Sequence, residues 1–175
     1  MIAAIRTGDR HAFAELVRRH SRWVRAVVFG VLGDTDRVDD VVQQVWALAW
    51  DRIGELKDVE RWRPWLYRLA RNAAVDAGRD ETRRRRFHRT LAEMPPTISR
   101  PTAPGEELIA RERRQILWDA IRGLPALYRE PFVLRHLEGW NYQQIADLLQ
   151  MPVDSIETRL VRARRLLREA LAGKI

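Results

Sequence analysis

Apolar side chains recur with helical spacing on both sides of a single proline-rich stretch, and this pattern constrains the fold more than any other feature. Residues 95–105, PPTISRPTAPG, contain four of the eight prolines and almost no apolar periodicity. Because proline interrupts regular helices and strands, this stretch is expected to be extended and mobile. The sequence therefore predicts an all-α fold of two small helical domains, residues 1–90 and 108–175, joined by a flexible linker over 91–107.

Within both predicted domains, apolar residues recur at positions i, i+3, i+4 and i+7, which is typical of amphipathic helices. No convincing alternating strand is present, and Leu124, Pro125 and Gly139 mark breaks between helices in the second domain. The expected helices cover residues 9–31, 36–53 and 63–79 in the first domain, and residues 106–122, 126–138, 142–150 and 153–171 in the second.

The composition limits the partners and the chemistry of the chain. The formal net charge is +8 and the isoelectric point is near 11.0, which favours a polyanionic partner such as nucleic acid. There is no cysteine, which excludes disulfides, thiolate nucleophiles and cysteine-ligated zinc. No apolar run approaches the ~20 residues of a membrane helix and the amino terminus lacks a secretory signal, so a cytoplasmic protein without membrane contact is expected.

Residues 141–165, NYQQIADLLQMPVDSIETRLVRARR, predict a helix-turn-helix. Asn141 occupies the position of a helix N-cap, and Pro152 in the turn ends the first helix. On the second helix the apolar residues share one narrow face that must pack against the rest of the domain; they are Ile156, Leu160, Ala163 and Leu167.

The opposite face of this second helix is polar and basic. The side chains predicted to reach DNA are Thr158, Arg162 and Arg165, with Ser155 and Arg159 along one flank. Hydroxyl and guanidinium groups can contact bases and phosphates together, so the helix is predicted to enter the major groove of DNA. The alternative for the arginines alone is an ordinary solvated face. Glu157 would repel phosphate, and it is expected to pair with Arg164 or to lie beside the groove.

Two further helices, in the first domain, have exposed faces of opposite character. The helix over 36–53 directs Asp36, Asp40, Gln43, Gln44 and Asp51 outward, which suits docking on a basic protein surface. This segment lacks the spaced oxygen ligands of a calcium loop, so neither a metal nor a cofactor is expected. The helix over 63–79 directs Arg68, Arg71, Asn72 and Arg79 outward beside the loop over 54–60, where an unstacked base could bind.

Taken together, these segments resemble the extracytoplasmic-function sigma factors of the bacterial sigma-70 family over almost the whole chain. DRHAFAELVRRH, DRVDDVVQQVWALAW and WRPWLYRLARNAAVD resemble region two of that family. LPALYREPFVLRHLEGWNYQQIADLLQMPVDSIETRLVRARRLLREAL resembles region four. The resemblance implies a transcription initiation factor without catalysis of its own, which binds core RNA polymerase and gives it promoter specificity.

The resemblance also implies roles for individual residues. Asp36, Asp40, Gln43 and Gln44 would lie on the helix that docks on the β′ clamp helices, while region four would contact the β flap. Leu56, Lys57 and Asp58, with Asn72, would capture a flipped base of the minus-10 element, and Arg68, Arg71 and Arg79 would follow the backbone. Ser155, Thr158, Arg159, Arg162 and Arg165 would contact the minus-35 element. A monomer that is controlled by an anti-sigma factor is expected.

Two rival functions predict different behaviour. A helix-turn-helix repressor or activator would form a symmetric dimer and bind duplex DNA without polymerase. A nuclease or recombinase would need catalytic groups, but the sequence has no HExxH, GxSxG or phosphate-binding glycine loop, and its four histidines are dispersed. The chain is therefore not expected to be an enzyme.

Overall fold

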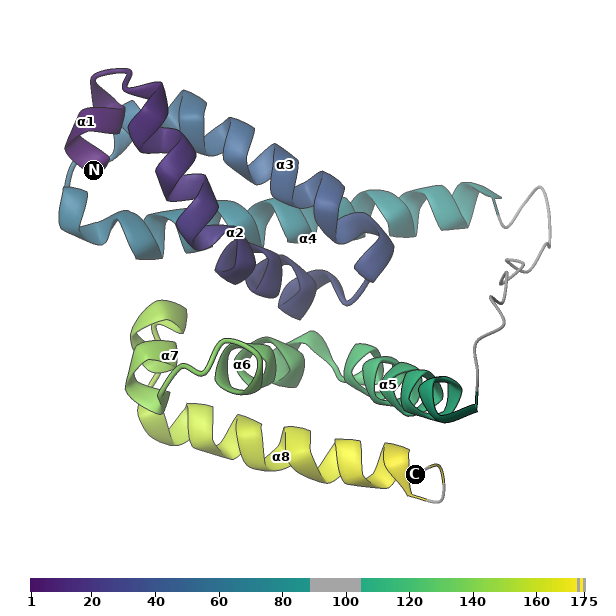
Figure 1. The fold of residues 1–175 in the computed structure, drawn as a ribbon. Coiled ribbons are helices and arrows are strands. Elements are labelled where there is room, and N and C mark those ends of the chain that lie inside the picture. The colour runs from purple at the N-terminus through teal and green to yellow at the C-terminus, as the bar shows by residue number, and fades with distance from the viewer. Residues whose placement is uncertain (89–104, 173, 175) are drawn as a thin grey trace.

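The computed structural model describes residues 1–88, 105–172 and 174, with side chains placed in 1–80, 112–172 and 174. All regular elements in these described ranges are helical (Figure 1). The N-terminal half contains α1 (Ile2–Arg6), α2 (Arg10–Leu32), α3 (Thr35–Arg52), the 3₁₀ turns Ile53–Glu55 and Val59–Arg61, and α4 (Trp62–His88). The C-terminal half contains α5 (Gly105–Gly123), α6 (Ala126–His136), α7 (Tyr142–Leu149) and α8 (Val153–Leu171). The all-α prediction is confirmed.

In the N-terminal half, three long helices pack around an aliphatic core. The side chain of Asp9 caps α2 by accepting a hydrogen bond from the Ala12 amide, and Asp34 caps α3 through the Asp36 amide. Helices α2, α3 and α4 then pack against one another. The fully buried side chains at their centre are Leu16, Val24, Val27, Val28, Val45 and Leu66.

In the C-terminal half, the turn of the helix-turn-helix is built from local hydrogen bonds. Asn141 and Gln144 form a capping box at the start of α7, in which each side chain accepts a hydrogen bond from the other's backbone amide. Gln150 adopts a left-handed conformation (φ 54°), and the Met151 amide donates to the Ala146 carbonyl at 3.0 Å. Pro152 then precedes α8. The apolar stripe of α8 is buried as predicted, at Ile156, Leu160, Ala163 and Leu167.

The two halves are packed against each other along α2 and α6, which lie side by side in Figure 1. Aromatic rings cross this seam: Trp23 stacks on Trp140 with centroids 5.7 Å apart, and Trp118 meets Phe29 edge-on at 5.4 Å. An aromatic pair of this kind contributes about 1 kcal/mol beyond its area burial. The sequence left the relative placement of the halves open, and the structure supplies it.

Several element boundaries differ from the expectations. Helix α4 continues to His88, whereas its apolar periodicity predicted an end near Arg79. Arginine is a strong helix former, and no helix-breaking glycine or proline follows Arg79 before His88. The sequence therefore allows the helix to continue to His88. The short α1 was not anticipated. Most of the predicted linker, residues 91–104, lies outside the described residues. None of the described helices is long and apolar enough to cross a membrane.

Candidate nucleic-acid and polymerase interfaces

The face of α8 that was predicted to contact DNA is gathered around one depression. Ser155, Thr158, Arg159 and Arg162, here called the α8 surface, line a hollow of about 310 Å³. Thr158 and Arg162 are exposed, whereas Ser155 and Arg159 are partly covered. The structure therefore brings these four predicted residues together on one accessible face. Arg165 lies further along the helix and forms an ion pair with Glu169 at 3.7 Å.

Helix α6 adds residues to this surface that the sequence had not indicated. Leu127 and Tyr128, in the first turn of α6, and Met151 in the turn line the same hollow. The Tyr128 hydroxyl accepts a long hydrogen bond of 3.5 Å from an Arg162 Nη. The LPALY segment signals only a helix start in the sequence, and a tyrosine three residues after a proline carries no signal for this contact.

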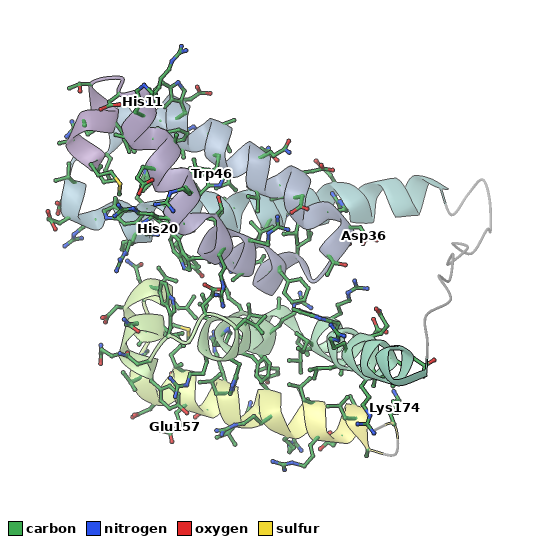
Figure 2. All side chains as sticks on the ribbon, viewed as in Figure 1. His11, His20, Asp36, Trp46, Glu157 and Lys174 are labelled. Carbon is green, nitrogen blue, oxygen red and sulfur yellow. The ribbon has the colours of Figure 1, made fainter. Side chains whose placement is uncertain are left out.

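Glu157 lies on the outer side of α8, facing away from the N-terminal half, as Figure 2 shows. The side chain is exposed and forms no ion pair with any described residue. The expected pairing with Arg164 is therefore wrong, because the Arg164 Nε instead donates to the Leu160 carbonyl at 3.4 Å. Glu157 keeps the second expected position, beside the hollow rather than in its lining.

The second predicted DNA surface, on α4 and the preceding loop, is exposed along the helix. Arg68, Arg71, Asn72 and Arg79 all face solvent. Of these, Arg79 pairs loosely with Asp76 at 3.8 Å, and Arg71 approaches Glu130 of α6 at 3.9 Å.

The loop before α4 divides the three remaining minus-10 candidates. Lys57 and Asp58 are exposed, but Leu56 is only 5% exposed and belongs to the core. The Asp58 carboxylate accepts the Glu60 amide at 2.9 Å and pairs with Arg61 at 3.5 Å, which fixes the loop. Leu56 therefore anchors the loop in the core, and Lys57 and Asp58 form the accessible part of the loop.

The predicted polymerase-docking face on α3 is open. Asp36, Asp40, Gln43 and Gln44 are exposed on one side of the helix, opposite the buried Val38, Val41, Val42 and Val45. Figure 2 places Asp36 at the start of α3. Asp40, Gln43 and Gln44 make no side-chain hydrogen bond or ion pair with described residues. Their carboxylate and amide groups are thus available to a partner.

The seam between the halves contains a buried charged pair that the sequence did not reveal. Arg129 and Glu130, adjacent on α6, are only 6% and 7% exposed. The Arg129 guanidinium donates to four main-chain carbonyls, those of Gly30 (3.0 Å), Val31 (2.9 Å), Arg122 (2.7 Å) and Leu124 (2.8 Å). Two of these carbonyls lie at the end of α2 and two at the end of α5, so one side chain joins three helices.

Glu130 has a different set of partners. Its Oε1 accepts a hydrogen bond of 2.6 Å from the Tyr67 hydroxyl of α4. Burial raises the pKa of Glu130, while the Tyr67 hydrogen bond and the charges of Arg71, Arg159 and Arg129 oppose that shift. Burial also raises the pKa of Tyr67, so its hydroxyl keeps the proton that it donates.

Close approach of α2 and α6 depends on glycine. A Cβ at Gly30 would lie 3.1 Å from the Glu130 Cα, and one at Gly33 would lie 2.5 Å from the Arg129 guanidinium carbon. Gly33 also has a positive φ of 72° at the end of α2, which favours glycine. At the edge of the seam, Arg22 pairs with Glu138 at 3.1 Å.

Together, the helix-turn-helix, the exposed arginines and the open acidic face define a two-part, DNA-binding class of helical protein. No group of side chains that could hold a metal ion occurs among the described residues. Residues 16–84 match the family model for sigma-70 region 2, and residues 114–167 match that for sigma-70 region 4. The chain belongs to the sigma-70 family, in its extracytoplasmic-function group. It is a transcription initiation factor that gives RNA polymerase its promoter specificity.

Known relatives match the chain from end to end. An ECF RNA polymerase sigma-E factor from Haemophilus influenzae is 29% identical over 173 residues, covering 95% of this chain and 91% of the relative. SigW of Bacillus subtilis, also an ECF RNA polymerase sigma factor, is 25% identical, with 97% and 94% covered. Among solved structures, CnrH in complex with the cytosolic domain of CnrY superposes with a TM-score of 0.70 at 24% identity, covering 99% and 96% of the two chains. RpoE of Bartonella quintana, in complex with the anti-sigma factor NepR, has a TM-score of 0.66 at 21% identity, with 94% and 99% covered.

Proposed function

We propose that the exposed surfaces divide the work of promoter recognition. The face of α3 with Asp36, Asp40, Gln43 and Gln44 docks on the β′ clamp helices of core polymerase, and the C-terminal half contacts the β flap. The observation that carries the docking proposal is the set of exposed carboxylate and amide groups on α3, three of them unpaired, in a chain whose net charge is +8.

In this proposal the two basic surfaces contact the two promoter elements. Arg68, Arg71, Asn72 and Arg79, with Lys57 and Asp58 of the anchored loop, take up the minus-10 element as it opens. The α8 surface and Arg165 contact the minus-35 element in the major groove. Support comes from the exposure of most of these side chains and from the hollow that four of them line on α8. We assign the minus-10 contacts to the domain of residues 1–90 and the minus-35 contacts to the domain of residues 108–175.

The proposal extends to partners and location. The chain works in the bacterial cytoplasm, as a monomer until it joins core polymerase, and has no catalysis of its own. An anti-sigma factor restrains it, which is supported by the similar folds of CnrH, solved with the cytosolic domain of CnrY, and of the Bartonella RpoE, solved with the anti-sigma factor NepR.

The decisive experiment is transcription in vitro with purified core polymerase on a library of promoter fragments. The parent chain should support initiation at a subset of fragments. Asp40→Arg should lower the affinity for core, measured by fluorescence anisotropy, because it places a cation on the acidic face. Asp76→Arg is the matched control, since it makes the same change of charge on α4 rather than on α3. Equal core binding by Asp40→Arg and the parent would remove α3 from the interface.

Promoter opening is tested separately. Asn72→Ala should slow open-complex formation on duplex promoters, while a template with a pre-melted minus-10 element should restore the rate to near that of the parent. Permanganate reactivity of the minus-10 thymines measures opening directly. Unchanged reactivity in Asn72→Ala would exclude this residue from the pocket for the flipped base.

A further inference from the structure

A cavity of about 440 Å³ in the seam brings together one arginine from each proposed DNA surface. Arg71 of α4 and Arg159 of α8 both line it, and Tyr67, Glu130 and Met151 are also part of the lining. Three residues of the seam cavity, Leu127, Met151 and Arg159, also line the hollow of the α8 surface, so the two spaces adjoin.

Glu130 is the acidic side chain of this cavity lining, and its position resembles that of a bound anion. Its carboxylate is buried, accepts a hydrogen bond from the Tyr67 hydroxyl at 2.6 Å, lies 3.9 Å from Arg71, and shares the cavity lining with Arg159. Phosphate groups of DNA are held in the same way, by hydroxyl donors and guanidinium groups together.

We propose that Glu130 serves the free chain as an internal substitute for a DNA phosphate, which competes with DNA for Arg71 and Arg159 while the halves are docked and so weakens DNA binding by both. This inference rests on the proposed function, because both arginines are assigned there as DNA contacts. Release of the seam would free two cations, one on each DNA-binding surface, in a single step.

The docked arrangement and promoter binding exclude each other by distance. The minus-10 and minus-35 elements are named for positions about 25 base pairs apart, which corresponds to roughly 85 Å of duplex at about 3.4 Å per base pair. In the docked chain, Arg71 and Arg159 line the same cavity. The seam must therefore open before both elements are contacted, and each arginine then exchanges Glu130 for a phosphate.

The glycines of the seam allow it to be opened without touching a charged group. Gly30 lies inside α2, and a Cβ there would meet the Glu130 backbone at 3.1 Å. Gly78 lies inside α4, where a Cβ would have an ordinary contact of 3.7 Å with Leu32. Gly30→Ala and Gly30→Leu should therefore push α2 and α6 apart by increasing amounts. Gly78→Ala is the matched control, because it brings the same gain in helix propensity without this clash.

Opening is measured by energy transfer between dyes on Ala47→Cys and Ala170→Cys, two exposed positions in a chain without native cysteine. Transfer should fall for Gly30→Ala and fall further for Gly30→Leu, while Gly78→Ala keeps the parent's value. Far-ultraviolet circular dichroism confirms that each variant stays helical. Parental transfer in a folded Gly30→Leu chain would overturn the docked arrangement.

The charge itself is tested by Glu130→Gln, which keeps the shape and an acceptor for Tyr67 but removes the anion. The probe is a random-sequence DNA duplex of about 30 base pairs, titrated with the polymerase-free chain at several salt concentrations. The affinity of the chain for this duplex should rise about tenfold. The slope of log affinity against log salt concentration should become more negative by about 0.9 for each arginine freed. Gly30→Leu should raise affinity in the same direction.

Matched variants separate this mechanism from a general change in charge. Glu138→Gln removes a carboxylate that also lies at the seam but pairs with Arg22, so it should raise DNA affinity far less. Adding Arg71→Ala and Arg159→Ala to Glu130→Gln should abolish most of the gain. An equal gain from Glu138→Gln, or a gain that survives loss of both arginines, would overturn the proposal.

The proposed function and this inference fail in different experiments. Loss of core-dependent transcription in Arg71→Ala and Arg159→Ala, with no change in free-chain DNA binding on Glu130→Gln, would overturn the internal substitute alone. Full transcription by both arginine variants would overturn their assignment as DNA contacts. The energy-transfer measurement tests whether the two halves are docked in the free chain, and its result does not depend on the transcription or DNA-binding assays.

Discussion

Arginine is used in opposite ways in the seam and on the α8 surface. Arg129 in the seam is 6% exposed and donates to four main-chain carbonyls, whereas Arg162 on α8 is exposed and has a single hydrogen bond of 3.5 Å. A guanidinium offers five donors, so the donors of Arg129 are largely used within the fold and those of Arg162 are largely free. The number of internal partners, more than the residue type, separates a structural arginine from one that can bind DNA.

The largest effect is expected for Arg129→Ala. Removing the side chain leaves four carbonyls at helix ends without their donor and leaves Glu130 with one cation fewer, so the unfolding free energy should fall by about 3–5 kcal/mol. Urea denaturation followed by circular dichroism measures this loss. If Arg129→Ala were as stable as the parent, the seam would not depend on this side chain.

A second prediction reverses the comparison on α8. Arg162→Ala should change the unfolding free energy by less than about 0.5 kcal/mol, since its side chain is exposed and weakly bonded. Binding of the polymerase complex to minus-35 duplexes should nevertheless weaken by about 1–3 kcal/mol. A combination of lost stability and retained promoter affinity would place Arg162 among the structural arginines instead.

A smaller effect, of about 1.5 kcal/mol in unfolding free energy, is expected for Tyr67→Phe. The change keeps the ring and removes only the hydroxyl that donates to the buried Glu130 at 2.6 Å. Tyr142→Phe is the control, because Arg135 stacks on its ring, which the substitution retains. Similar losses in the two variants would show that the Glu130 hydrogen bond has no special weight.

The pH dependence of stability gives a fourth prediction. Because burial raises the pKa of Glu130, the folded chain binds a proton that the unfolded chain has lost, between the ordinary pKa of glutamate, about 4.3, and the raised value. The contribution of Glu130 to stability therefore falls as pH rises through this window. Glu130→Gln should gain stability relative to the parent, by about 1 kcal/mol or less, on going from pH 4 to pH 7. A constant difference across that range, in urea melts at each pH, would contradict the shift.

The smallest effect is expected for Tyr128→Phe. Its hydroxyl accepts a hydrogen bond at the 3.5 Å limit from Arg162, so its removal should change minus-35 affinity by less than about threefold. Electrophoretic mobility shift assays with the polymerase complex can resolve this difference. A loss as large as that of Arg162→Ala would mean that Tyr128 itself touches the DNA.

Local sequence signals were sufficient for most of the helices and for the exposed face of α8 that is proposed to contact DNA. The period of Ile156, Leu160, Ala163 and Leu167 identified the buried stripe of α8, and the residues opposite it are exposed or line the hollow. The cap at Asn141 was also found, because capping depends on neighbours within one turn. Such features depend on residues that are close together in the sequence, so a short sequence segment is enough to predict them.

Contacts between distant segments had no comparable signal. Arg129 and Glu130 look like ordinary exposed charges of an amphipathic helix, and the burial of Arg129 depends on carbonyls of α2, 98 and 99 residues away in the chain. Leu56 was placed in a DNA pocket by resemblance, although its apolar side chain packs into the core. Both cases turn on tertiary packing, which periodicity within one helix cannot specify.

The glycine at position 30 also limits how the chain can drift in sequence. Every other residue type adds at least a Cβ, and a Cβ there already meets the Glu130 backbone at 3.1 Å. A substitution at this site therefore requires the Glu130 backbone to shift by a few tenths of an ångström, and larger side chains should push the halves further apart. A lineage could thus change the closeness of the two halves through one codon, and could restore it by recovering glycine or by compensating changes in α6.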